Sequence, residues 1–161
     1  MKQSIRIGIG FLVLVILVGV ILGVDVLRRQ SSADQAVQPG EIPIYVNGDL
    51  AGKFSPDDLG RLERVSFVEA EEGKTQEGWL LRDVLLLNLE EDSLAAETLI
   101  VVSSSSRNKT AQLSWAEVND PANMVMFDLA NKGTLKLVSL LEKLDTRDEW
   151  VQDTDKIEII Y

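Results

Sequence analysis

The sequence contains no cysteine and no histidine in 161 residues. Without cysteine the chain has no disulfides, no iron–sulfur ligation, no thiolate chemistry and no lipoprotein anchor attached through a cysteine. Since histidine is also missing, we expect no tight zinc or haem site. The metal sites that remain are hard-ion sites built from carboxylates.

Basic residues are also scarce, because 16 lysines and arginines stand against 26 aspartates and glutamates, for a net charge of −10. A chain this acidic is repelled by the phosphates of nucleic acid and by anionic lipid headgroups. We therefore expect no nucleic-acid partner and no charge-driven docking on a membrane surface.

One long hydrophobic run is present, at residues 7–24 (IGIGFLVLVILVGVILGV). A helix of this length is about 27 Å long, close to the roughly 30 Å hydrocarbon core of a bilayer. A cleaved signal peptide is the alternative, but its apolar region is usually about 7 to 15 residues long and ends in an A-x-A site. Here Asp25 and Arg28 follow the run. We interpret residues 1–29 as an uncleaved transmembrane anchor.

The orientation of this anchor is less strongly specified by charge. Lys2 and Arg6 precede the run, and Arg28 and Arg29 follow it, so the two flanks nearly balance under the positive-inside rule. We choose the orientation with the amino terminus inside and the C-terminal domain outside the cytoplasm.

Two segments follow the anchor. Residues 30–41 (QSSADQAVQPGE) are polar and end in Pro-Gly, which is typical of a flexible linker. Residues 42–161 are enough for one domain.

The first part of that domain predicts two hairpins. Asn47-Gly48 predicts a tight turn between a strand from Ile42 and a second strand ending near Phe54. Ser55-Pro56-Asp57-Asp58 is typical of a helix start, and predicts a short helix through Leu59 and Leu62. Residues 65–70 and 74–79 flank Glu71-Glu72-Gly73, and predict a second hairpin.

The remaining pattern predicts further short elements. Residues 80–89 are apolar nearly all round, which predicts a buried helix, and residues 99–102 predict a strand buried on both faces. Ser114 and Glu117 have the spacing of a capping box after a strand at 110–113. Alternation at 124–129, with Val125, Phe127 and Leu129 on one face, and at 135–137 and 157–161 predicts three more strands. The predicted class is α+β, a β-rich mixed-sheet domain with short helices.

The candidate ligand site is the polar turn between the strands at 99–102 and 110–113. Small hydroxyl residues and two cations there can hydrogen-bond an anion. The same residues also serve as a solvated turn that needs no ligand. The candidate binding residues are Ser104, Ser105, Ser106, Arg107, Asn108 and Lys109.

Two other groups of residues allow a purely structural explanation as well as a functional one. Carboxylates cluster at 90–92 and 145–155. They suit a weak calcium site or, as we favour, a solvated acidic surface. Trp79, Trp115 and Trp150 are expected to pack in or at the rim of the core rather than to form a ligand cage.

The order of segments in residues 42–161 resembles the molybdopterin-binding domain of the sulfite oxidase family, above all its small exported versions. FSPDDLGRLERVSFVE, LIVVSSSSRNKTAQLSWAEV and WVQDTDKIEII follow one another as in that family. GWLLRDVL at residues 78–85 is similar to the family's G-x-x-L-x-D-hydrophobic-L element. The resemblance implies that family's fold and a pterin ligand.

Family enzymes bind molybdenum through the pterin dithiolene and one protein cysteine, which by order of elements falls near residues 65–71. This chain has VSFVEAE there, with Ser66 as a conceivable oxygen ligand or, as we favour, an exposed strand position. We therefore expect a non-catalytic module without protein-ligated molybdenum, which binds a pterin-like ligand or a membrane protein partner. The alternative is a cofactor-dependent subunit of a molybdopterin oxidoreductase or electron-transfer complex.

Overall fold

The computed structural model describes residues 37–130 and 132–161. The apolar run at residues 7–24 and most of the predicted linker lie outside the described residues. Within the described part of the chain, no helix combines the length and apolar character needed to cross a membrane. Val37–Tyr161 form one compact unit.

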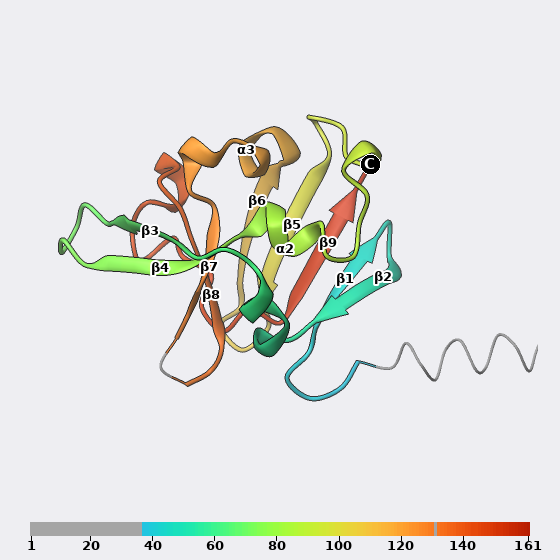
Figure 1. Ribbon diagram of the computed structural model, residues 1–161, viewed down its shortest axis with the longest axis horizontal. Helices are drawn as coiled ribbons and strands as arrows, with labels where there is room; N and C mark the ends of the chain where they lie inside the picture. The colour runs from blue at the N-terminus through green and yellow to red at the C-terminus, as the bar shows by residue number, and fades with distance from the viewer. Residues whose placement is uncertain (1–36, 131) are drawn as a thin grey trace, which may run out of the picture. The chain divides into compact units, whose positions relative to one another are not determined.

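The described residues contain nine strands, which form two sheets (Figure 1). The five-stranded sheet has the order β2-β1-β9-β5-β6 and the four-stranded sheet has the order β3-β4-β7-β8. β1 pairs with β9 in parallel and the other pairs are antiparallel. The five-stranded sheet is therefore mixed, as predicted, whereas the four-stranded sheet is purely antiparallel. The first sheet contains β1 (Ile42–Val46), β2 (Asp49–Phe54), β5 (Leu99–Ser104), β6 (Lys109–Ser114) and β9 (Lys156–Ile160); the second contains β3 (Val65–Val68), β4 (Thr75–Leu80), β7 (Met126–Leu129) and β8 (Leu135–Val138).

The helices in the described residues are all short, as predicted. The Glu117 backbone N–H donates to the Ser114 hydroxyl at 3.2 Å, and the Ser114 N–H donates to the Glu117 carboxylate at 2.8 Å. This capping box starts α3 as predicted. The helical segments are η1 (Pro56–Arg61), α2 (Leu81–Leu85), η2 (Glu91–Ser93), α3 (Trp115–Asn119), η3 (Pro121–Asn123) and η4 (Glu142–Leu144).

Both predicted hairpins are present, and their turns explain the residues found there. Asn47 and Gly48 have φ values of 49° and 89°, the left-handed conformation that a two-residue hairpin turn requires. Gly73 has a φ of 67° in the turn between β3 and β4. These turns fix the register of each hairpin, and therefore which side chains reach the core.

One apolar core joins the two sheets. Ile44, Ile100 and Ile157 enter it from the five-stranded sheet, and Phe127 and Leu137 enter it from the four-stranded sheet. The rings of Phe54 and Phe127 lie 6.0 Å apart between centroids across this core. Trp79, Trp115 and Trp150 are buried, so their predicted packing role is confirmed.

Three sequence predictions need correction. The helix expected over residues 80–89 covers only Leu81–Leu85, because the apolar side chains that follow pack in an irregular turn. β5 is fully buried on the face of Ile100 and Val102 but only half-buried on the face of Leu99 and Val101. Leu129, predicted to share the buried face of Phe127, is 42% exposed, because it ends β7 beyond the reach of the core.

Candidate functional site

The turn between β5 and β6 delivers the predicted binding residues. Its last residue, Asn108, has a left-handed φ of 49°, which closes the chain back into β6. Ser104 is buried at the end of β5, and its hydroxyl lies 3.3 Å from the hydroxyl of Ser106. Ser105 and Arg107 are exposed. The turn therefore presents Arg107 outward and keeps Ser104 inside, while Lys109 is half-buried.

A second loop, just before β9, fastens this turn in place. The Ser105 N–H donates to the Asp155 carboxylate at 2.8 Å, and the Asp155 N–H donates to the carbonyl of Ser103 at 3.0 Å. The Nε of Arg107 donates to the Asp153 carboxylate at 2.7 Å. Asp153 and Asp155, which the sequence predicts to lie on a solvated acidic surface, thus order the turn.

Asp153 is held as an anion by its donors. The Thr134 hydroxyl, at 2.8 Å, and then the Arg107 guanidinium lower the pKa of Asp153 below its ordinary value of 3.8. Asp153 accepts from the Nε of Arg107. The two terminal amino groups of Arg107 can therefore still face a ligand.

Arg107 and Lys109 line a hollow of about 240 Å³ together with Arg147, Asp148, Trp150 and Gln152, which we call the Trp150 hollow. Lys109 begins β6, whereas the other wall comes from the segment after η4. The hollow therefore combines residues some 40 positions apart in the sequence. A second hollow of about 370 Å³ adjoins it through Arg147, Trp150 and Gln152, and extends to Lys136 and Ala130.

Trp150 forms a rigid floor for this hollow. Its indole N–H donates to the carbonyl of Leu144 at 3.1 Å, and only 3% of the residue is exposed. The Lys136 ammonium lies 4.6 Å from the centroid of the Trp150 ring, and the Arg147 guanidinium carbon lies 5.8 Å from it. These cation–π contacts gather positive charge over the ring.

The cations around the hollow differ in how far internal partners neutralise them. Lys136 is fully engaged, since it forms an ion pair with Asp128 at 2.9 Å and donates to Gln76 at 2.8 Å. Lys109 has no ion-pair partner within residues 37–130 and 132–161. Arg147 donates to Glu72 at 2.9 Å, but its Nε is buried and without a hydrogen-bond partner in the described chain.

The turn between β3 and β4 positions Arg147. The Glu71 carboxylate accepts from the Arg147 backbone N–H at 3.2 Å. Glu69 is 1% exposed and orders this turn, because its carboxylate accepts the backbone N–H groups of Glu71 at 2.7 Å, Glu72 at 2.9 Å and Lys74 at 3.2 Å. The residue pattern alone does not predict this role for Glu69.

We expect the stabilisation given by Glu69 to depend on pH. The backbone N–H of Glu72, above all, holds the pKa of Glu69 below its ordinary value of 4.5. Because the folded pKa is the lower one, the stabilisation is complete above pH 4.5 and is lost as the pH falls through the folded value. In urea titrations, the stability difference between wild type and Glu69→Gln should therefore shrink below pH 4.5.

Glu63→Gln, at an exposed position, is the control. A stability difference between wild type and Glu69→Gln that is constant with pH contradicts the prediction.

The predicted binding residues divide into two groups. Arg107 and Lys109 reach the Trp150 hollow, whereas Ser104, Ser105, Ser106 and Asn108 do not line it. The residue pattern predicts no place in the hollow for Arg147 or Gln152, and it predicts only packing for Trp150. The only signal for them is a basic residue three positions before a tryptophan in an acidic stretch, TRDEW.

The molybdenum site implied by the family resemblance does not fit these residues. Residues 65–71 offer carboxylates and one serine but no thiol. Ser66 is an exposed residue of β3 opposite Glu77, which confirms the preferred interpretation of this position. No group of three or more acidic side chains in the described residues is arranged to hold a metal ion.

No protein-family model matches the chain, and no curated protein is similar to it in sequence.

Proposed function

We propose that this chain is a membrane-anchored binding module outside the cytoplasm, which holds a pterin-like anionic ligand in the Trp150 hollow and catalyses no reaction. The anchor is the apolar run at residues 7–24. Protease added to intact spheroplasts should remove the domain; complete protection would mean that the orientation is the reverse.

The observation that carries the proposal is the convergence of Arg107, Lys109 and Arg147 on one hollow in a chain of net charge −10. Such a chain repels anions at long range, so an anion binds only where cations gather locally. The guanidinium groups can donate paired hydrogen bonds to a carboxylate or a phosphate ester. Their presence in the hollow favours an anionic ligand over a neutral one.

The polar side chains and the size of the hollow suit a flat heterocyclic ligand. The amide of Gln152 can both donate and accept hydrogen bonds, as the edge of a pterin ring requires. The two adjoining hollows, of about 240 Å³ and 370 Å³, give such a ring room beyond the cationic residues. Because Trp150 is buried, it serves as a floor and not as a stacking partner.

The proposal includes no molybdenum-dependent catalysis, because the side chains present do not suit the metal. No thiol is available in the chain to ligate molybdenum. Glu71 is the last residue of the segment 65–71, where the family's cysteine would fall, and Glu72 follows it. Both accept hydrogen bonds from Arg147. Stoichiometric molybdenum in the purified protein, by elemental analysis, would contradict this part of the proposal.

Arg107→Ala should weaken the binding of pterin-6-carboxylate, a fluorescent anionic pterin, by about 1.5 to 3 kcal/mol, the range for a hydrogen bond to a charged group. Fluorescence titration of the full chain measures this change. The ion pair of Arg107 with Asp153 is half exposed, so its loss should change stability little.

Arg61→Ala is the matched control, because it removes the same charge from η1 without touching the hollow. It should leave the affinity for pterin-6-carboxylate unchanged. Equal weakening in both variants would mean that only net charge matters. Unchanged binding in Arg107→Ala would exclude the proposed site.

A further inference from the structure

The strand β6 lies at one edge of the five-stranded sheet, where only β5 pairs with it. An edge strand presents unpaired backbone N–H and C=O groups. Which residues of β6 present them follows from the pairing register.

The free groups belong to Thr110 and Gln112. The Trp115 N–H donates to the carbonyl of Thr98 at 2.8 Å, one step beyond the last pair of the register, Leu99 and Ser114. Trp115 and Thr98 therefore continue the antiparallel ladder as a hydrogen-bonded pair. Since hydrogen-bonded and non-hydrogen-bonded pairs alternate, Thr110 and Gln112 direct their backbone groups away from β5. The N–H of Ser114, two residues further on, confirms this direction, because it points outward to the Glu117 carboxylate. Within the described chain the backbone groups of Thr110 and Gln112 have no hydrogen-bond partner.

The other sheet edges are protected by devices that β6 lacks. The register of β2 on β1 is interrupted between Ile44 and Tyr45. The outer side of β8 is bridged by Val151, and β3 is only four residues long. β6 is six residues long and pairs without interruption, from Lys109 to Ser114. It is therefore the edge best suited to accept another strand.

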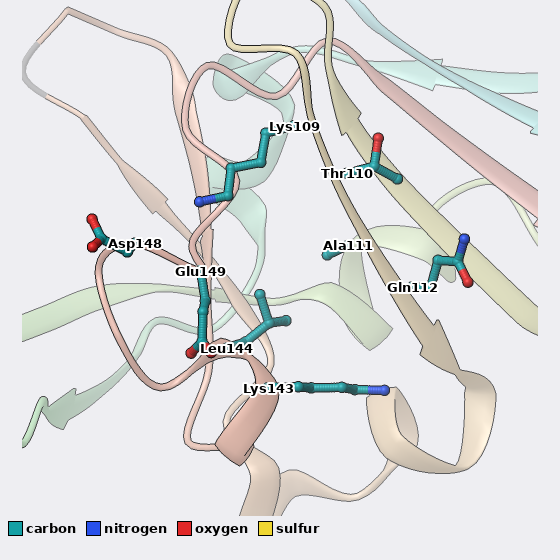
Figure 2. A pocket seen from close by; sticks show the side chains of 8 residues that line it. All are labelled: Lys109, Thr110, Ala111, Gln112, Lys143, Leu144, Asp148 and Glu149. Atoms are coloured by element: carbon teal, nitrogen blue, oxygen red, sulfur yellow. The ribbon is translucent and has the colours of Figure 1, made fainter.

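A groove of about 450 Å³ runs beside this edge (Figure 2). Figure 2 shows the Ala111 side chain facing the groove between β6 and Leu144, while Thr110 and Gln112 point away from Leu144. Ala111 and Leu144 are buried and form an apolar floor. The far wall is fixed, because Lys143 forms an ion pair with Glu117 of α3 at 2.8 Å.

We propose that an extended segment of a partner protein adds to the free edge of β6 in this groove. Its backbone would pair with Thr110 and Gln112, and every second side chain would lie over Ala111 and Leu144. That floor accepts a small apolar side chain. The four charged residues of the groove, Lys109, Lys143, Asp148 and Glu149, are two cations and two anions, so a strongly charged segment of either sign would meet like charges there. The segment is therefore uncharged, and it is recognised by backbone hydrogen bonds and shape.

A random heptapeptide library displayed on phage, selected against the full chain, provides the probe. Synthetic copies of the selected peptides should slow hydrogen exchange at the Thr110 and Gln112 amides, measured by NMR. A copy with N-methyl groups on alternate backbone nitrogens should bind about tenfold more weakly, equivalent to about 1.4 kcal/mol.

Gln112→Pro removes one outward N–H and should weaken peptide binding similarly, since proline is tolerated at a sheet edge. Gln112→Ala keeps that N–H and should bind like wild type. The proposal is overturned if no peptide is selected, if the protected amides lie elsewhere, or if the N-methylated copy binds as well as its parent. The comparison of the N-methylated peptide with its parent uses the unsubstituted chain, so it remains valid even if Gln112→Pro does not fold.

Discussion

Gly78→Ala should destabilise the domain by about 3 kcal/mol or more, at the upper end of the cost of overpacking. Gly78 lies in β4, directly opposite Asp128 of β7. A Cβ atom at this position would lie 1.8 Å from the carbonyl oxygen of Phe127 and 2.6 Å from its carbonyl carbon. Both are backbone atoms, so no side-chain rotation can relieve the clash. β7 cannot move away, because β8 pairs with its other edge.

Urea denaturation followed by circular dichroism measures this loss. Gly60→Ala is the matched control, because a Cβ atom at Gly60 meets no heavy atom within 4 Å. It should change stability by less than about 0.5 kcal/mol, as surface substitutions usually do. A neutral Gly78→Ala would mean that β4 and β7 are not paired in this register.

Leu85→Ala should cost about 2 to 5 kcal/mol, the usual range for a leucine truncated in a packed interior. Leu85 is the last residue of α2 and has no exposed surface. It belongs to the core that both sheets share, together with Leu81 and Val84 of the same helix. Shortening its side chain leaves a cavity that the surrounding strands can fill only in part.

Leu140→Ala removes the same atoms from a residue that is 48% exposed, and is the control for Leu85→Ala. The backbone N–H of Leu140, which donates to the carbonyl of Asn123 at 2.9 Å, is kept in the variant. The control should therefore lose much less stability in the same urea experiment. Equal losses in the two variants would contradict the placement of α2 in the core.

The local elements of this fold follow from short-range signals in the sequence. Asn47-Gly48 predicts the first hairpin, because few other residue pairs accept two positive φ angles. Ser114 and Glu117 predict the start of α3, because each side chain bonds the other's backbone. The end of α2 at Leu85 has no such signal, since the apolar residues continue to Leu89 and suit helix and turn alike.

The candidate site could be predicted only in part, because tertiary contacts assemble it. Arg107 and Lys109 follow from the polar turn after an apolar strand. Arg147, Trp150 and Gln152 join them only because β8 and η4 lead the chain back past β6. The internal partner of Arg107, Asp153, likewise comes from a distant loop that the residue pattern does not connect to the turn.

The most direct test of ligand binding at the Trp150 hollow is a titration of the ¹⁵N-labelled full chain with pterin-6-carboxylate, monitored at the tryptophan indole N–H signals. Trp79, Trp115 and Trp150 are all buried to nearly the same extent, so each serves as a reference for the others. We predict that the Trp150 signal shifts and saturates while the Trp79 and Trp115 signals stay in place, because only Trp150 lines the hollow. An unchanged Trp150 signal, or a shift confined to Trp79 or Trp115, would contradict binding at this site.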